Sequence, residues 1–445
     1  MLGGRSRVDI TPPTGVPMGG YLARAKPAED IHDPLFARAL VLDDGEKRVA
    51  VVAADLLGFD RAMARSLRER IAEATGIPAS HIMLTCSHTH SGPLIVRTRI
   101  GHADRSYVES LQGKLVAVVR AAAEDLQPVR VGAGRAKVYL GVNRRQRTED
   151  NRVVLGTNPE GYAYPYAHIL DVAKENGGPL AMLFTYGAHP VVLGPKNLHI
   201  SGDYAGMAER EVEENFGGQA VALFALGFAG DVNVEFDKRN FSEVETCGVA
   251  LARAVLEEWK DIELASDLTL QARTTLVPLP LEAPPQPGEA ERILYDAREQ
   301  LTSMLGRGED EAAIHHRRAM VEWASELVDT AGADDPEPTA ELEIQGLAIG
   351  PVALLGLSAE VFAEYAKGLD EVSPFEHTFP ISNANGAIGY LPTAAAFDEG
   401  GYEVETAPRL FGALGFQPQV ESLVREAMGR VLRELGGGEA PPGEG

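Results

Sequence analysis

Two histidines separated by one residue lie in the segment TCSHTHSGP, residues 85–93. His88 and His90 are followed at once by a Gly-Pro pair, which ends regular structure. In an extended strand, residues i and i+2 point to the same face, so the two imidazoles would lie side by side. Imidazole is a common metal ligand, and His90 could then reach a ligand bound beside a metal on His88. The alternative is a polar strand end with two hydrogen-bonded histidines, and the spacing alone does not decide.

Other polar residues follow segments that have the composition of buried strands. His189 follows AMLFTYGA, Asp231 and Asn233 follow ALFALGFAG, and Glu360 follows VALLGLSA. Ligands of open α/β sheets bind beyond strand ends, so these residues are candidates for one shared site. Two histidines and a carboxylate from separate strands would suit Zn²⁺ and leave room for water. Each residue taken alone is more simply structural, and it is their shared pattern that favours a site.

Positioning these residues requires alternating strands and helices. RALVLDD, KRVAVVAADLLGF and HIMLTCSHTH indicate strands, and residues 60–76 indicate a helix with Asp60 as N-cap and Gly76 beyond its end. Further along, AHILDVAK, GPLAMLFTYGAHP, ELEIQGLAIG and VALLGL indicate strands, and residues 201–218, 241–261 and 420–435 indicate helices. This alternation predicts an α/β fold with mixed β-sheets flanked by helices.

We expect a single catalytic domain over residues 1–436. The composition changes at LVPLPLEAPPQPGE, and the charged pattern after it predicts a helical insertion at about residues 285–335, with a break at GRGED. Residues 437–445 consist of Gly, Glu, Ala and Pro and predict a disordered tail.

The overall charge excludes several classes of protein. The 445 residues include 41 basic and 65 acidic ones, a formal net charge of −24 at pH 7. Such a surface repels phosphate backbones and anionic headgroups, so we expect no nucleic-acid partner and no tight bilayer attachment. We expect no transmembrane segment, because no window approaches the roughly 20 apolar residues needed to span a bilayer. The sequence also lacks a Gly-rich phosphate-binding motif, which disfavours a nucleotide binder.

The cysteines and the N-terminus bear on location. Cys86 and Cys247 are the only cysteines, which is no disulfide framework and fits a reducing compartment. The N-terminus has no apolar run typical of a signal peptide. We therefore expect a cytoplasmic protein, although a secreted form without its leader would have the same pattern. The oligomeric state cannot be predicted.

Several segments resemble the N-terminal catalytic domain of the neutral/alkaline non-lysosomal ceramidases, a family of zinc-dependent amidases. In order from residue 18 to about 405 they are MGGYLARAKPAEDIHDPLFARALVL, SHTHSGP, GVNRR, FTYGAHPVVLGPKNLHISGDYAGMAERE, FALGFAGDVN, LSAEVFAEY, NGAIGYLPT and GGYEVE. The resemblance implies that one Zn²⁺ per chain is held by His88, His189, Glu360 and Tyr390. A tyrosine is a less common zinc ligand than the other three.

The same resemblance implies hydrolysis of the amide (C–N) bond of an N-acyl or lipid-like small molecule by zinc-activated water. His90, Arg144 and Tyr402 would line the substrate site. His90 and Tyr402 could donate hydrogen bonds to the developing oxyanion, and Arg144 could bind a polar head group or orient the carbonyl. Either Tyr390 or His90 could pass a proton to the leaving amine, and the sequence does not choose between them.

Two positions depart from the family pattern. Asn233 stands where the family has a serine near the reacting centre, and Phe411 stands where it has a further tyrosine. An amide cannot act as an acyl-forming nucleophile, so a serine mechanism is excluded there, although Asn233 could hydrogen-bond the substrate. No counterpart of the family's C-terminal immunoglobulin-like domain is expected after the last helix. Two alternatives follow: a hydrolase of a smaller soluble amide or ester, or a catalytically silent relative that binds a ligand.

Overall fold

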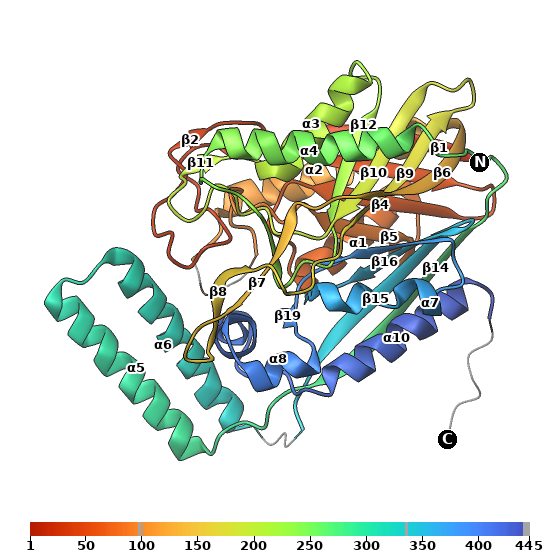
Figure 1. Ribbon diagram of the computed structural model, residues 1–445. Coiled ribbons are helices and arrows are strands. Elements are labelled where there is room, and N and C mark those ends of the chain that lie inside the picture. Colours follow the sequence, from red (N-terminus) through yellow and green to blue (C-terminus); the bar gives the residue numbers. More distant parts are fainter. Residues whose placement is uncertain (97–98, 100, 334–336, 439–445) are drawn as a thin grey trace.

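A computed structural model describes residues 1–96, 99, 101–333 and 337–438 (Figure 1). Its largest sheet has eight strands in the order β12-β10-β9-β6-β1-β3-β4-β5. In chain order they are β1 (Leu2–Asp9), β3 (Phe36–Asp43), β4 (Arg48–Ala54), β5 (Ile82–Cys86), β6 (Gln127–Lys137), β9 (Tyr166–Lys174), β10 (Pro179–Tyr186) and β12 (Val221–Leu226).

Two strand–helix–strand units lie within this sheet. Helix α1 (Arg61–Thr75) connects the parallel strands β4 and β5, and the segment with α3 (Asp203–Asn215) connects the parallel strands β10 and β12. The other neighbouring pairs of the sheet are antiparallel. A parallel pair needs a long crossover, which explains why helices occur at these two places.

Both faces of the large sheet are buried. Along β3, Ala37, Ala39 and Val41 pack with α1 and α2 (Arg105–Glu124), whereas Leu40 and Leu42 face a second sheet, as the two-residue period of a strand requires. The second sheet has the order β14-β15-β16-β18. Its strands are β14 (Leu270–Pro280), β15 (Thr339–Ile349), β16 (Val352–Leu357) and β18 (His377–Ile381), and α10 (Val420–Leu435) packs on β14 and β15.

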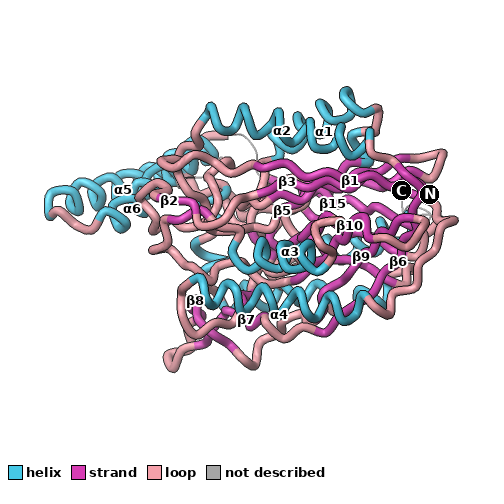
Figure 2. Tube along the Cα trace, turned by 90° about the horizontal axis from the view of Figure 1, so that it is seen from above, coloured by secondary structure: helices cyan, strands magenta, loops and turns pink. Residues whose placement is uncertain are grey.

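Seen from above, α1 and α2 lie on one side of the strands, and α3 and α4 (Phe241–Trp259) lie on the other (Figure 2). Helices α5 (Pro287–Arg307) and α6 (Glu311–Ala331) form a hairpin that projects from the body (Figure 1). None of the helices in the described part of the chain is both long and apolar enough to cross a membrane.

Shorter strands and helical turns complete the fold. The strands are β7 (Gly141–Arg147), β8 (Val153–Asn158) and β13 (Val232–Val234) in one small sheet, β17 (Glu360–Val361) paired with β19 (Tyr390–Leu391), and β2 (Asp30–Ile31) paired with β11 (His199–Ile200). The helical turns are η1 (Ala79–His81), η2 (Ala363–Ala366), α7 (Leu369–Val372), α8 (Ala394–Glu399), η3 (Tyr402–Thr406) and α9 (Pro408–Phe411).

The predicted α/β fold with mixed sheets is confirmed, and so is the helix at 60–76. The carboxylate of Asp60 accepts the N–H of Met63, and Gly76 ends α1 with a φ of 74°. The strand predicted to reach His90 is wrong in its length. Strand β5 ends at Cys86, and His88 has a φ of 64°, so the chain leaves the extended conformation before the two histidines. Strand alternation therefore does not explain how their side chains are placed.

Candidate metal centre

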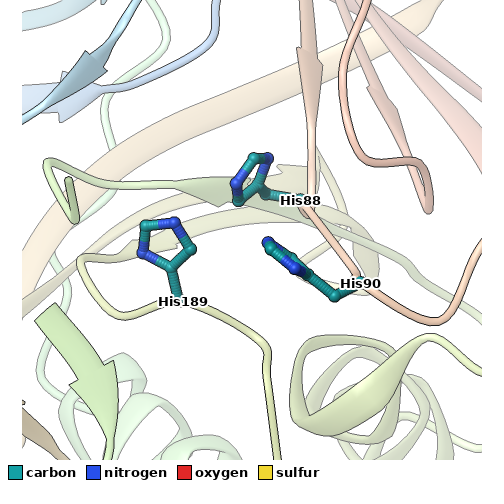
Figure 3. Close-up of side chains that lie close together, drawn as sticks. All are labelled: His88, His90 and His189. Atoms are coloured by element: carbon teal, nitrogen blue, oxygen red, sulfur yellow. The ribbon is translucent and has the colours of Figure 1, made fainter. Parts of the chain in front are cut away.

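Three buried histidines meet beyond the ends of two strands (Figure 3). His88 and His90 come from the loop after β5, and His189 comes from the segment after β10. The ring centres are 5.0 Å apart for His88 and His90, 4.9 Å for His88 and His189, and 5.6 Å for His90 and His189. Each ring offers one nitrogen to a group in which all three nitrogens lie within 4.8 Å of one another. This geometry could hold a metal ion.

Backbone carbonyls orient two of the imidazoles. Nδ1 of His189 donates to the carbonyl of Ala229 at 2.8 Å, and Nδ1 of His88 lies against the carbonyl of Leu57 and 3.1 Å from Nδ2 of Asn383. With Nδ1 engaged in this way, Nε2 of each ring is the free ligand atom. The left-handed backbone at His88 is part of this arrangement, because it turns the ring out of the line of β5.

A carboxylate completes the cluster. Oε2 of Glu360 lies 3.0 Å from Nε2 of His189 and 3.5 Å from Nε2 of His88. Glu360 in β17 pairs with Tyr390 in β19, and this register brings the Tyr390 phenol to Glu360 and to Arg144. The structure therefore brings together the four residues that the sequence predicted as metal ligands.

Unpaired buried nitrogens show that these residues fit a metal ion. Nε2 of His88 and both ring nitrogens of His90 are buried without a hydrogen-bond partner among the described residues. A buried polar atom left without a partner costs about 1–3 kcal/mol, so such a cluster normally has a ligand to satisfy it. Distances alone do not decide whether His90 or Glu360 would be the third metal ligand beside His88 and His189. His90 belongs to the compact group of nitrogens, and Glu360 contacts both His88 and His189.

The charges of the cluster are strongly coupled. Burial would raise the pKa of Glu360, but His88 and His189 hold it well below its usual range. Burial lowers the pKa of His88, yet Glu360 outweighs burial and raises it to about 10. Burial, followed by the charge of Arg144, lowers the pKa of His189 to about 4. Burial, followed by the charge of His88, lowers the pKa of His90 well below its usual range. His90 and His189 are thus neutral, which is the form of imidazole that binds a metal.

The predicted substrate residues lie next to the cluster. The guanidinium of Arg144 lies 5.4 Å from the ring centre of Tyr390 and 5.9 Å from that of Tyr402. Its Nη1 lies 3.5 Å from Oδ1 of Asn233, and the two tyrosine rings meet edge to face with centres 5.9 Å apart. His90, Arg144, Tyr402 and Asn233 are therefore neighbours of the candidate metal centre.

Sequence reasoning missed Glu403. This carboxylate, 1% exposed, accepts from Nε of Arg144 and from Nη1 of Arg145, both at 2.8 Å. It fixes Arg144 and the turn η3, which begins with Tyr402. The available signal was its place in GGYEVE beside Tyr402, a segment already identified by its resemblance to the family.

Sequence reasoning also missed Gly20 and Arg24. A Cβ on Gly20 would lie 2.5 Å from the ring of His90, and the φ of Gly20 is 95°, so only glycine fits against this imidazole. Nη1 of Arg24 donates to the carbonyls of Gly19 and His90, both at 2.8 Å. Both residues lie in MGGYLAR, inside the first segment that resembles the family. The motif thus marked these positions, but the sequence did not show that they contact His90.

The cluster lies between two pockets. One, of about 110 Å³, is lined by His88, His90 and Glu360 and otherwise mainly by apolar side chains. The second, of about 600 Å³, contains Arg144 and Asn233. Both pockets share His90, Tyr390 and Tyr402, together with Gly20, Leu22 and Leu410. A substrate bound at the cluster could therefore reach into both pockets.

The fold and the site define a mixed α/β protein with a buried histidine–carboxylate centre between two pockets. The family model for neutral/alkaline non-lysosomal ceramidase, N-terminal, matches residues 2–250. The chain belongs to this family, and the predicted resemblance is confirmed.

Similar proteins agree with this. Neutral ceramidase A of Dictyostelium discoideum is 26% identical over 253 residues, which are 51% of this chain and 34% of that protein. The neutral ceramidase of Pseudomonas aeruginosa is 26% identical over 251 residues, 52% of this chain and 36% of that protein. The matched segment thus spans about a third of these relatives.

Solved structures share the fold over nearly the whole chain. The crystal structure of neutral ceramidase from Pseudomonas aeruginosa aligns with a TM-score of 0.74 and 21% identity, covering 99% of this chain and 75% of that one. A structure titled "Ceramidase complexed with C2" aligns with a TM-score of 0.75 and 18% identity, covering 99% and 77%.

Proposed function

We propose that this protein is a zinc-dependent hydrolase that cleaves the amide bond of an N-acyl substrate, as a ceramidase does. The observation that carries the proposal is the convergence of three buried imidazoles and Glu360, with unpaired ring nitrogens, at the junction of two pockets. Membership in the ceramidase family and relatives named neutral ceramidases support the reaction type.

In this proposal His88, His189, Glu360 and Tyr390 hold one Zn²⁺. Two imidazoles with an anionic oxygen are a familiar zinc set, and His88, whose pKa Glu360 raises to about 10, would give up its proton when the metal binds. When bound, Zn²⁺ supplies the Lewis acidity that makes water a nucleophile at neutral pH. The carboxylate of Glu360 contacts both His88 and His189, whereas His90 is left to act on the substrate.

The neighbouring residues suit a carbonyl that gains negative charge. Burial raises the pKa of Tyr402 to about 12, so its phenol keeps its proton at neutral pH and can donate a hydrogen bond. Burial lowers the pKa of Arg144, but Tyr390 and Glu403 outweigh it and raise it, so the guanidinium stays charged. Nη2 of Arg144 has no partner within the described ranges and is free to orient the substrate. One such donor typically contributes about 3 kcal/mol to the transition state.

Elemental analysis combined with a hydrolysis assay tests the proposal. The protein is stripped with a chelator, reloaded with zinc and given fluorogenic N-acyl amides and a ceramide analogue. We expect turnover only with zinc, and His88→Ala and His189→Ala should lose zinc and turnover together while circular dichroism shows a folded chain. His199→Ala is the matched control, because this half-exposed histidine lies outside the cluster. Turnover by the stripped protein, or full zinc in both variants, would contradict the proposal.

Asn233 favours a second candidate function, a silent relative that binds its ligand without cleaving it. Its amide lines the larger pocket and lies beside Arg144, where the family pattern has a serine. The same assay separates the two functions, since the second one predicts tight binding of N-acyl ligands without product. The cytoplasmic location expected from the composition stays a prediction.

A further inference from the structure

We propose that Phe411 limits the length of the acyl group, so that short N-acyl substrates are cleaved faster than long ones. This inference rests on the proposed function and adds a substrate class to it. It comes from the shape of the cavities around the candidate metal centre and from the contacts that hold Phe411.

The small pocket has room for only a few carbon atoms. Its volume is about 110 Å³, and away from His88, His90 and Glu360 its wall is formed mainly by apolar side chains, including Leu57 and Phe411. An engineered apolar cavity of about 150 Å³ accommodates a single benzene molecule. An apolar acyl group therefore suits this pocket, but a long chain exceeds its volume.

A larger cavity adjoins the small pocket. It measures about 600 Å³, and the two cavities share Tyr390 and Phe411, together with Asp60 and Ala387. The Phe411 ring meets Tyr390 edge to face, with centres 6.2 Å apart, and lies over Gly389. Phe411 thus stands in the wall that the cavities share, and its removal would join them. The ring is 38% exposed, so it contributes little to the core.

The backbone around Phe411 is held in place. Arg99 donates from Nη1 to the carbonyls of Arg409 at 2.8 Å and of Gly412 at 3.3 Å. On α6, Nε1 of Trp323 donates to the carbonyl of Ala413 at 2.9 Å, and the guanidinium of Arg409 stacks over the Trp323 ring at 4.7 Å. The two Trp323 contacts tie the segment to the projecting hairpin, whose helix α6 lies against α9. The position of Phe411 is therefore fixed by Arg99 and by the helical insertion.

The other half of the substrate has its own space. The pocket that contains Arg144, Asn233 and Arg239 shares His90 and Tyr402 with the small pocket and offers polar groups. A carbonyl bound between His90 and Tyr402 would place its apolar acyl group in the small pocket and its amine half in the polar pocket.

The test compares acyl chains on one fluorogenic amine, from acetyl and butyryl to octanoyl and palmitoyl, with the zinc-loaded full chain. We expect kcat/KM to peak at a short acyl group. Phe411→Ala should move the peak to longer chains, because each newly buried methylene contributes roughly fourfold. The ratio of the palmitoyl to the butyryl value should rise by about tenfold or more. Phe411→Trp should shift the peak the other way.

The control is Tyr295→Ala, which removes an exposed aromatic ring on α5 and should leave the chain-length profile unchanged. A wild-type preference for palmitoyl, or a Phe411→Ala profile that superimposes on the wild type, would overturn the inference. If no substrate is cleaved, the proposed hydrolase function is refuted, but the role of Phe411 in limiting acyl length is not yet decided. Calorimetric titration with butyrate and palmitate then decides the inference, which requires that palmitate gain affinity only in Phe411→Ala.

Discussion

Replacing Glu403 with alanine removes a buried carboxylate that two buried arginines share. Glu403 is 1% exposed, Arg144 5% and Arg145 6%, and each arginine donates to Glu403 at 2.8 Å. Removing one partner of a buried pair costs about 3–5 kcal/mol, because an uncompensated charge stays behind. Arg145 keeps a second partner, Glu399, at 3.1 Å, so Arg144 bears most of the loss. We therefore expect the free energy of unfolding to fall by about 3–5 kcal/mol.

The same substitution should damage the substrate site. Without Glu403, Arg144 loses the partner that holds it beside Tyr390, and the turn that carries Tyr402 loses its anchor. Because misplacing a substrate-orienting group by about 1 Å can cost about a hundredfold in rate, we expect kcat/KM to fall by about that factor at unchanged zinc content.

Urea denaturation of the zinc-loaded protein measures the first effect, and hydrolysis of a short N-acyl amide measures the second. Glu399→Ala is the matched control: it removes a 37% exposed partner of Arg145, and surface pairs contribute about 0–1 kcal/mol. Glu403→Gln keeps the shape of the side chain and one acceptor oxygen. Its free energy of unfolding and its kcat/KM should therefore lie between those of Glu403→Ala and Glu399→Ala. Equal stability of Glu403→Ala and Glu399→Ala, with wild-type kcat/KM in both, would refute the reasoning.

Two further predictions concern Gly20 and Asp171. Gly20→Ala should displace the ring of His90, because the new Cβ would lie 2.5 Å from the imidazole. We therefore expect kcat/KM to fall while elemental analysis still finds zinc. Turnover equal to that of the wild type would contradict this prediction. Burial raises the pKa of Asp171 from 3.8 to about 6, against the hydrogen bond from Trp259. The folded state therefore binds this proton more tightly, and the protein loses up to about 3 kcal/mol as the pH rises from 4 through 6. The melting temperature of Asp171→Asn should thus exceed that of the wild type at pH 8 and equal it near pH 4. A difference in melting temperature that is the same at both pH values would contradict the raised pKa of Asp171.

Local signals in the sequence predicted much of the fold. Helix α1 was placed within a residue at each end because Asp60 and Gly76 carry their own capping chemistry. The strand before His88 was predicted too long, because the positive φ there depends on contacts with Leu57 and Asn383, which lie 31 and 295 residues away. No period in the local sequence reports such contacts.

The candidate site was predicted in two unequal ways. Polar residues after strands indicated His189 and Glu360, since strand ends gather at one edge of a sheet. Tyr390 and Arg144 came only from the resemblance to the family. Glu403 was missed because its role arises from its contact with Arg144, 259 residues away, and a buried glutamate beside a tyrosine has no distinctive pattern of its own.

The zinc content of Glu360→Ala beside that of His90→Ala tests the central claim most directly, because these residues are the two candidates for the third protein ligand. We expect one zinc per chain in the wild type and in His90→Ala, which should nevertheless lose turnover, and little zinc in Glu360→Ala. Full zinc in Glu360→Ala with loss of zinc in His90→Ala would contradict it.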